Sequence, residues 1–348
     1  MIRMKIVVRG TNWVGDAIMT IPALRELRRI FPEAEIVLHT RSWAEGIFRD
    51  AEFFDRIITI DKTSSRVKDV FNQAGILSEW KFDLAVLLPN SFESALTTKL
   101  ARIPKRIGYN KDLRGLLLTD PLPVPEWKEK RHEVFYYLNI VAEIERRFLA
   151  TETVLETFPI SDLEISAERR YSARQILSGA GADLSKKTIA LGVGSTNSRA
   201  KRWGAENYAK LNDRLQTELN ANVVLVGSKD EIDISSEVGK LSNYAPIILT
   251  GQTDLAEATA ILSEVDLLIS NDMGLAHIAP ATGTKTLVIF GPTNPETTRP
   301  FSGNATVIRQ KVECSPCMLR DCPIDHRCMT RISVDEVFTV CEQTLITN

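Results

Sequence analysis

The sequence predicts an α/β protein made of two doubly wound domains. Short β-branched runs alternate with segments whose apolar residues recur every three or four positions, as in strands followed by amphipathic helices. The alternation weakens into a polar stretch near residues 149–166 and then restarts. The length of 348 residues also exceeds what one hydrophobic core usually organises. We therefore expect two Rossmann-like domains in tandem, with a ligand cleft between the carboxyl ends of their sheets.

Each half contributes several expected strands. Those of the first half are KIVVRG (5–10), AEIVLHT (34–40), RIITID (56–61) and DLAVLLPN (83–90). Those of the second half are TIALGVGS (188–195), ANVVLVGS (221–228), PIILTG (246–251), DLLISND (266–272) and KTLVIFGP (285–292). Residues 15–31 have a clear helical pattern, and 333–346 form a helix with Ser333 as N-cap and Glu336 three positions later.

These elements suggest three parts of the chain. We expect an N-terminal domain at 1–160, a C-terminal domain at 161–330, and a final helical segment at 331–348 that packs back on the N-terminal domain. No run approaches the 18 or more apolar residues that would span a bilayer, and no secretory h-region opens the chain. We therefore expect a cytoplasmic protein, able to associate peripherally with the inner membrane.

The overall charge argues against a protein that binds nucleic acid. Net charge is −2 and the sequence pI is about 6.2, so the chain lacks the global positive field that attracts a polyanion. An anionic partner must then be met by a local group of basic residues.

The first turn of the chain, RGTNWVGDAIMT (9–20), combines two features that conflict. A glycine-spaced turn after a strand usually opens a helix whose free N–H groups bind phosphate. Here the turn carries Asp16, whose negative charge would repel a phosphate. The residue types therefore suggest that this turn has a different task.

The second half contains the phosphate-binding signals. In LGVGSTNSRAKRW (191–203), Gly192 and Gly194 let the backbone approach an anion, Ser195 and Thr196 can donate to its oxygens, and Lys201 supplies charge. The spacing matches neither G-x-G-x-x-G nor a Walker A loop. A hydroxyl-capped loop with a solvated lysine is the structural alternative.

A second signal follows in LLISNDMGLAHIAPATGTKTLVIFGP (267–292). A buried strand ends in Asn271 and Asp272, and Gly274 then opens a helix whose first N–H groups point toward the ligand edge. His277 lies in the first turn of that helix, within reach of a diphosphate or a sugar hydroxyl. The alternatives are an N-cap role for Asp272 and a packing role for His277.

A basic run, RIPKRIGYNKDLRG (102–115), stands out in the first half. It has five cations against one acid, Asp112, and these are Arg102, Lys105, Arg106, Lys111 and Arg114. It can bind an acidic acceptor, because guanidinium groups bind phosphate and carboxylate bidentately. A solvated face is the alternative interpretation.

Four of the five cysteines lie in ECSPCMLRDCPIDHRC (313–328). Cys314, Cys317, Cys322 and Cys328 are enough for one structural zinc ion, with His326 as a substitute ligand. In a reducing compartment the alternative is reduced thiols rather than disulfides. No catalytic metal is indicated.

Several motifs together resemble glycosyltransferase family 9. They are GTNWVGDAIMTIPALRELRRIFPEAEI, LLPNSFESAL, AKRW, VVLVGSKDE, LTGQTDLAEATAIL and NDMGLAHIAPATGTKTLVIFGPTNP, in order from Lys5 to about Pro300. The resemblance implies a GT-B fold that binds the acceptor on the N-terminal domain and the nucleotide sugar on the C-terminal domain. It also implies inverting transfer of L-glycero-D-manno-heptose from ADP-heptose to the first heptose of the lipopolysaccharide inner core, without an essential cofactor.

The resemblance also assigns roles to individual residues. Asp16 matches the general base, and Lys201 matches a lysine that binds the diphosphate and assists catalysis. Further donor-binding positions are Ser195, Thr196, Thr253, Asp272, Met273, Gly274, Leu275 and His277. The ribose position falls on Asp230 or Glu231, because Lys229 interrupts the expected pattern. Acceptor-binding positions are Asn12, Trp13, Asn90, Ser91, Arg106, Lys111 and Arg114.

Other functions fit parts of this pattern. A family member could instead transfer heptose directly to Kdo, or use another nucleotide sugar. A GT-B-fold UDP-sugar epimerase and a non-catalytic nucleotide-binding protein are further alternatives. The partners expected from the leading hypothesis are ADP-heptose and Kdo-lipid A that carries inner-core heptose at the cytoplasmic face of the inner membrane.

Overall fold

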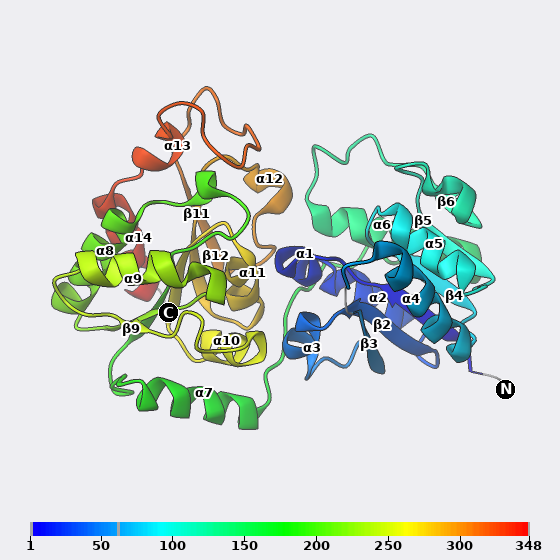
Figure 1. Cartoon of the computed structure of the whole chain (residues 1–348), viewed down its shortest axis with the longest axis horizontal. Helices are drawn as coiled ribbons and strands as arrows, with labels where there is room; N and C mark the ends of the chain where they lie inside the picture. Colours follow the sequence, from blue (N-terminus) through cyan, green and yellow to red (C-terminus); the bar gives the residue numbers. More distant parts are fainter. Residues whose placement is uncertain (1–2, 61–62, 347–348) are drawn as a thin grey trace. The chain divides into compact units, whose positions relative to one another are not determined.

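The computed structural model describes residues 3–60 and 63–346 and divides the chain into two compact units (Figure 1). The first unit spans 1–161 and the second 162–348. Asp61, the last residue of the expected strand 56–61, lies outside the described residues.

The first unit contains a parallel six-stranded sheet in the order β3-β2-β1-β4-β5-β6. Its strands are β1 (Lys5–Arg9), β2 (Glu35–Arg41), β3 (Arg56–Ile60), β4 (Leu84–Leu87), β5 (Lys105–Tyr109) and β6 (Asp120–Leu122). The chain order reverses between β1 and β4, where Val8 pairs with Leu38 on one side and Val86 on the other. Ligands bind at such a reversal, outside the carboxyl ends of the strands.

Helices connect these parallel strands. They are α1 (Val14–Met19), α2 (Ile21–Ile30), α3 (Trp43–Phe48), α4 (Arg66–Trp80), α5 (Phe92–Leu100), the 3₁₀ helix η1 (Arg114–Leu117) and α6 (Glu133–Leu149). The helical pattern of 15–31 is split at Thr20, because Pro22 occupies the first turn of α2 and has no N–H to continue a helix. The split leaves α1 as a separate short helix that carries Asp16.

The second unit repeats the same topology. Its strands are β7 (Thr188–Gly192), β8 (Asn222–Leu225), β9 (Ile247–Ile248), β10 (Leu267–Asn271), β11 (Lys285–Phe290) and β12 (Ala305–Arg309). They are parallel in the order β12-β11-β10-β7-β8-β9, with the reversal between β7 and β10. Every residue of β7 and β10 is buried, as expected for strands covered on both faces.

The helices of this unit complete the doubly wound arrangement. They are α7 (Ala167–Gly179), η2 (Arg199–Lys201), α8 (Ala205–Glu218), η3 (Lys229–Glu231), α9 (Ile232–Leu241), α10 (Leu255–Leu262), α11 (Gly274–Ala281), α12 (Pro295–Thr298), α13 (Arg327–Thr330) and α14 (Val334–Ile346). Within residues 3–60 and 63–346, each helix is too short or too polar to span a lipid bilayer.

The last helix, α14, belongs to the core of the second unit. Its Val337, Phe338 and Cys341 are fully buried among side chains of that unit, and Ser333 Oγ accepts the Glu336 N–H at 3.1 Å as the N-cap pattern predicts. The sequence predicts packing of this helix on the N-terminal domain. Its apolar face is instead buried against the second unit, where it covers α8.

Candidate active site

In the second unit, the ends of β7 and β10 meet where the strand order reverses. Gly192 pairs with Ser270, and a Cβ on Gly192 would lie 2.6 Å from the Ser270 Cβ. Only glycine allows the strands to approach this closely here. The edge therefore brings the loop after β7, residues 193–203, next to the loop after β10.

Asn271 holds these two loops together. Its Nδ2 donates to the carbonyls of Val193 and Gly194, both at 2.9 Å, and its Oδ1 accepts the Trp203 N–H at 3.1 Å and the Tyr208 hydroxyl at 3.0 Å. The side chain is fully buried with every polar atom engaged. The 193–203 loop is thus fixed at both ends by one amide.

Lys201 points toward the end of β10 and pairs with Asp272. Its Nζ lies 2.7 Å from Asp272 Oδ2, and that same oxygen accepts the Thr293 hydroxyl at 2.7 Å. Asp272 is 5% exposed, while a quarter of the Lys201 side chain remains accessible. The carboxylate therefore orients the ammonium group of a lysine whose side chain is partly exposed.

Helix α11 begins directly after this pair. Met273 is its N-cap in an extended conformation, and the Met273 side chain makes no cap hydrogen bond. The first N–H groups at Gly274 and Leu275 are thus available to a ligand oxygen. His277 is 5% exposed on the same helix, so its ring lies mostly within the packed interior.

The hydroxyls predicted after β7 differ in accessibility. Ser195 is buried and Thr196 is exposed. Arg202, which the sequence analysis did not select, donates from Nη2 to the Ser195 carbonyl at 3.2 Å. Its Nε is buried and has no hydrogen-bond partner among the described residues. A second cation therefore lies beside Lys201 in this loop.

The two acids predicted to bind the ribose differ in burial. Asp230 is exposed, whereas Glu231 is 2% exposed and accepts the Ser228 N–H at 2.8 Å through Oε2. Its Oε1 has no hydrogen-bond partner within residues 3–60 and 63–346. A Cβ on Gly194 would lie 2.2 Å from that oxygen, so Glu231 reaches the loop after β7.

Thr253, another predicted donor-binding residue, lies outside the loops after β7 and β10. It is partly buried just before Asp254, the N-cap of α10, which forms a capping box with Glu257. The residues that follow Thr253 thus cap helix α10.

In the first unit, Asp16 lies in the first turn of α1 at the carboxyl end of β1. It is partly exposed, and its charge acts on the buried Tyr137 of α6. Burial, together with the charges of Asp16 and Glu133, raises the pKa of the Tyr137 hydroxyl well above its usual range. The phenol therefore stays neutral beside the carboxylate.

The loop before α1 is held by Arg9. Its Nη2 donates to Asn12 Oδ1 at 3.2 Å, and its Nη1 donates to the carbonyls of Gly10 and His39. Burial lowers the pKa of Arg9 to about 10, so its guanidinium stays charged at neutral pH. Asn12 and Trp13 are both exposed. The predicted acceptor residues of this loop are thus accessible on a fixed backbone.

Asn90 and Ser91 lie at the end of β4, next to β1 in the sheet. Ser91 caps α5 by accepting the Ser94 N–H at 3.2 Å, and Asn90 donates to the Tyr136 hydroxyl at 3.0 Å. Both remain partly exposed. Together with Asp16, they place predicted residues from two neighbouring strand ends on the same edge of the first sheet.

Two of the three basic residues predicted to bind the acceptor have structural tasks. Arg114 is fully buried, and its guanidinium donates to the carbonyls of Tyr109 and Pro89 and to Asn90 Oδ1. Arg106 donates to the carbonyls of Leu117 and Ile103. Arg114 and Arg106 therefore have structural contacts, while Lys111 is exposed, and acceptor binding by these three residues stays a prediction.

The cysteine loop, residues 313–328, contacts the segment that carries Lys201. Ala200 N donates to the Arg320 carbonyl at 2.9 Å, Ser198 Oγ donates to the same oxygen at 3.1 Å, and His326 Nε2 lies 2.6 Å from the Ala200 carbonyl. His326 is thus engaged with backbone. The loop braces η2 from outside.

The four thiols of this loop are not arranged as a ready metal site. Cys314 and Cys317 are exposed and Cys328 is buried. Burial first, and then the three neighbouring thiols, raise the pKa of Cys328. Among the described residues, no three His, Cys, Asp or Glu side chains converge closely enough to hold a metal ion.

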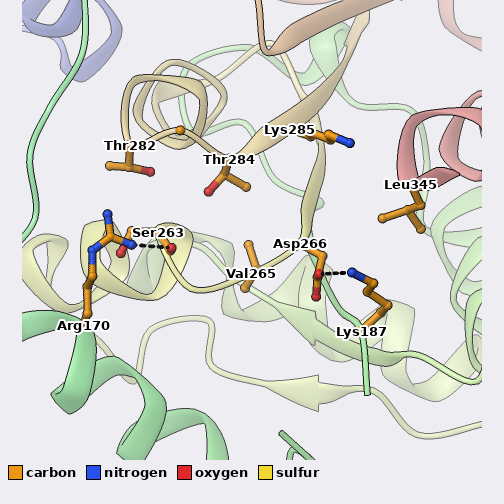
Figure 2. A pocket seen from close by; sticks show the side chains of 10 residues that line it. Arg170, Lys187, Ser263, Val265, Asp266, Thr282, Thr284, Lys285 and Leu345 are labelled. Atoms are coloured by element: carbon orange, nitrogen blue, oxygen red, sulfur yellow. Dashed lines mark hydrogen bonds and ion pairs between the residues drawn. The ribbon is translucent and has the colours of Figure 1, made fainter. Parts of the chain in front are cut away.

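A separate pocket of about 350 Å³ lies at the opposite edge of the second sheet (Figure 2). Its lining includes Lys187 and Asp266, which precede β7 and β10, and Lys285, the first residue of β11. Its cations are engaged: Lys187 with Asp266 at 2.7 Å, Arg170 with Glu264 at 3.2 Å, and Lys285 with the Thr344 carbonyl at 2.9 Å. This pocket is therefore distinct from the candidate donor site.

Comparison with known proteins identifies the family. Residues 73–327 match Glycosyltransferase family 9 (heptosyltransferase). Lipooligosaccharide heptosyltransferase 2 of Haemophilus ducreyi is 30% identical over 322 residues, covering 88% of each chain. Lipopolysaccharide heptosyltransferase 2 of Escherichia coli is 29% identical over 316 residues, with the same coverage. The chain belongs to glycosyltransferase family 9 and is a glycosyltransferase.

Solved structures agree on the fold. The structure of E. coli ADP-heptose lps heptosyltransferase II superposes with a TM-score of 0.85 at 26% identity, covering 99% of both chains. A glycosyl transferase family 9 protein from Veillonella parvula gives 0.86 at 23% identity, covering 100% of this chain and 99% of that one. The predicted GT-B fold is confirmed, and neither the epimerase nor the non-catalytic alternative is favoured.

Proposed function

We propose that this chain is an inverting heptosyltransferase. It transfers L-glycero-D-manno-heptose from ADP-heptose to the first heptose of the lipopolysaccharide inner core. The names of the relatives support the reaction class. The observation that carries the proposal is a contrast between two equivalent turns. The turn after β1 leads to the carboxylate Asp16 in α1, whereas the loop after β7 leads through Gly194 and Ser195 to the cation Lys201.

The donor binds in the second unit. Lys201 and the first N–H groups of α11 bind the diphosphate, since an ammonium group and a helix N-terminus both stabilise negative charge. Asp272 holds Lys201 through their 2.7 Å contact and therefore acts as a positioning residue. The unpaired Oε1 of Glu231 accepts a ribose hydroxyl, which favours Glu231 over the exposed Asp230.

Asp16 acts as the general base in the first unit. The acceptor hydroxyl oxygen bonds to the anomeric carbon, its proton passes to the Asp16 carboxylate, and the bond to ADP breaks with its electron pair on the leaving phosphate. Base assistance of this kind typically contributes about 10²–10⁴-fold. Lys201 and the α11 N-terminus stabilise the leaving charge in the same step.

Product analysis tests the choice of donor and acceptor. We expect mass spectrometry to show one added heptose when the protein is incubated with ADP-heptose and heptosylated Kdo-lipid A. Unheptosylated Kdo-lipid A should remain unchanged. A product formed only on the unheptosylated acceptor would assign the chain to direct transfer onto Kdo instead.

We also propose a structural zinc ion at Cys314, Cys317, Cys322 and Cys328, with no part in the reaction. Support comes from the four thiols within one short loop and from the bonds of that loop to Ala200, next to Lys201. Elemental analysis should find about one zinc per chain, and protein prepared without chelator that lacks metal would contradict the proposal.

The acceptor in this proposal is anchored in a lipid bilayer by its acyl chains. We therefore propose that the enzyme works peripherally at the cytoplasmic face of the inner membrane. The absence of a spanning helix in the described part of the chain is compatible with that arrangement.

A further inference from the structure

The tip between β5 and β6, residues 110–118, exposes two leucines almost completely. Leu113 is 87% exposed and Leu116 is 89% exposed. Both lie on or beside η1, where each gains little from packing on the unit that carries it. Large apolar side chains that stay in water at a loop tip suggest a partner surface.

The backbone of this tip is held firmly in place. The buried Arg114 ties it to the carbonyls of Tyr109 and Pro89. A Cβ on Gly115 would lie 2.3 Å from Asn110 Oδ1, so the turn closes tightly around that side chain. The leucines are thus presented on a fixed scaffold.

The backbone conformation of the tip is not explained by local packing. Asp112 and Leu113 both adopt left-handed backbone conformations, with φ of 52° and 60°. Leucine rarely occupies this region, because its Cβ crowds the backbone there. The strain is therefore maintained at a residue whose side chain faces solvent.

Positive charge surrounds the exposed leucines. Lys99 Nζ donates to the Leu116 carbonyl at 3.4 Å, Arg106 Nε donates to the Leu117 carbonyl at 2.8 Å, and Lys111 is exposed on the tip. The acid on the tip itself is Asp112. Asp120, which follows it, is paired with Arg147 at 2.7 Å. The cations thus outnumber the acids around the leucines.

We propose that this tip docks on an anionic lipid bilayer, with Leu113 and Leu116 entering the interface and Lys99, Arg106 and Lys111 facing the headgroups. Interfacial anchors combine exposed apolar side chains with Lys and Arg, because both burial and attraction to anionic lipid contribute to binding. The inference rests on the proposed function to the extent that the acceptor is membrane-anchored. It adds the surface by which the enzyme reaches the membrane.

Vesicle sedimentation tests the proposal with the full chain. Wild-type protein should sediment with phosphatidylglycerol-containing vesicles and much less with pure phosphatidylcholine, and higher ionic strength should weaken the binding. The double variant L113S/L116S should lose at least about tenfold in partitioning. Equal binding of wild type to neutral and anionic vesicles, or unchanged binding of the variant, would overturn the proposal.

A matched control uses exposed apolar residues of α4 in the same unit. Val67 and Phe71 are 66% and 61% exposed, so V67S/F71S should bind vesicles as wild type does. Selective loss of binding in this control would assign the docking surface to α4 and overturn the proposal. Thermal unfolding of all variants establishes that each is folded.

Transfer to a deacylated, water-soluble acceptor separates this proposal from the proposed function. L113S/L116S should retain wild-type transfer on that acceptor while losing vesicle binding. Loss of transfer together with retained vesicle binding would overturn the docking assignment. Absence of transfer by the wild-type protein would instead reject the proposed function, and the vesicle result would still stand.

Discussion

Lys201 and Asp272 form an ion pair that prepares the lysine for the diphosphate of the donor. Their 2.7 Å contact lies at the carboxyl edge of the second sheet, with Asp272 also held by Thr293. The pair keeps the ammonium group at a fixed place before the diphosphate arrives. Such preorganisation reduces the entropy lost on binding.

Lys201→Ala should weaken both ADP binding and turnover. Hydrogen bonds to charged groups contribute about 1.5–3 kcal/mol, which corresponds to a loss of roughly 10- to 100-fold in ADP affinity by calorimetry. Lys210→Ala, at an exposed position on α8 of the same unit, is the control and should leave affinity unchanged. If Lys201→Ala binds ADP with wild-type affinity, Lys201 does not bind the donor.

His39 provides a prediction about acid stability. It is 1% exposed, and its Nδ1 finds no hydrogen-bond partner in the described residues. Burial, with a smaller contribution from the Arg9 charge, lowers the pKa of His39 to about 3. The unfolded chain binds this proton near pH 6.5, so folded stability falls as pH drops from about 6.5 toward 3.

Between pH 7 and pH 5, this residue should cost about 2 kcal/mol of unfolding free energy in the wild type. Urea unfolding of the first unit at both pH values measures the loss. His39→Gln has no titrating ring, so its loss over the same interval should be smaller by that amount. Identical pH dependence in the two proteins would show that His39 does not titrate as described.

The positions of several residues around the turn after β7 depend on one glycine, Gly194. Gly194 accepts an Asn271 hydrogen bond through its carbonyl and leaves space for the Glu231 carboxylate. A side chain here would disturb the loop that leads to Lys201. The element therefore links the proposed ribose and diphosphate contacts.

Gly194→Ala should lower ADP affinity by about 5- to 150-fold, because its Cβ would lie 2.2 Å from Glu231 Oε1 and forced overpacking costs about 1–3 kcal/mol. Gly179→Ala at the end of α7 meets nothing within 4 Å and should be neutral or slightly stabilising. Calorimetric titration with ADP compares the two. Equal ADP affinities in the two variants would show that Gly194 does not contribute to nucleotide binding.

Most strands and the main turns were predictable from the sequence because their information is local, but β5, β6 and β12 were not among the expected strands. Buried strands such as β7 and β10 appear as β-branched and aliphatic runs, and glycines mark the turns that follow them. The task of Arg114 was not predictable, because its burial depends on carbonyls of Tyr109 and Pro89 that only the fold brings together. Charge patterning alone suggested a ligand-binding residue.

The candidate site shows the same limit. Asp272 and Lys201 were selected separately, but their direct pairing depends on how the loops after β7 and β10 meet. Asn271 was noted as the end of a strand, yet its four hydrogen bonds could not be inferred from one sequence. A polar residue just before a selected acid, in Asn271–Asp272, was the available signal.

The whole molecule consists of two units with one shared topology and different turn chemistry. Both sheets reverse their order between the first and fourth strands of the unit. Both first turns contain glycines and a buried hydroxyl, but the first leads to a carboxylate, Asp16 in α1, and the second leads to a cation, Lys201 in η2. We infer that the units divide proton acceptance and donor binding between them.

Asp16→Asn tests this division most directly, because the amide keeps the size of the side chain and removes its basicity. ADP-heptose affinity and single-turnover transfer to heptosylated Kdo-lipid A should be measured on the same preparation. If Asp16 is the general base, Asp16→Asn should keep near-normal donor affinity while transfer slows at least about a hundredfold. Ordinary transfer, or lost donor affinity with the fold intact, would contradict that role.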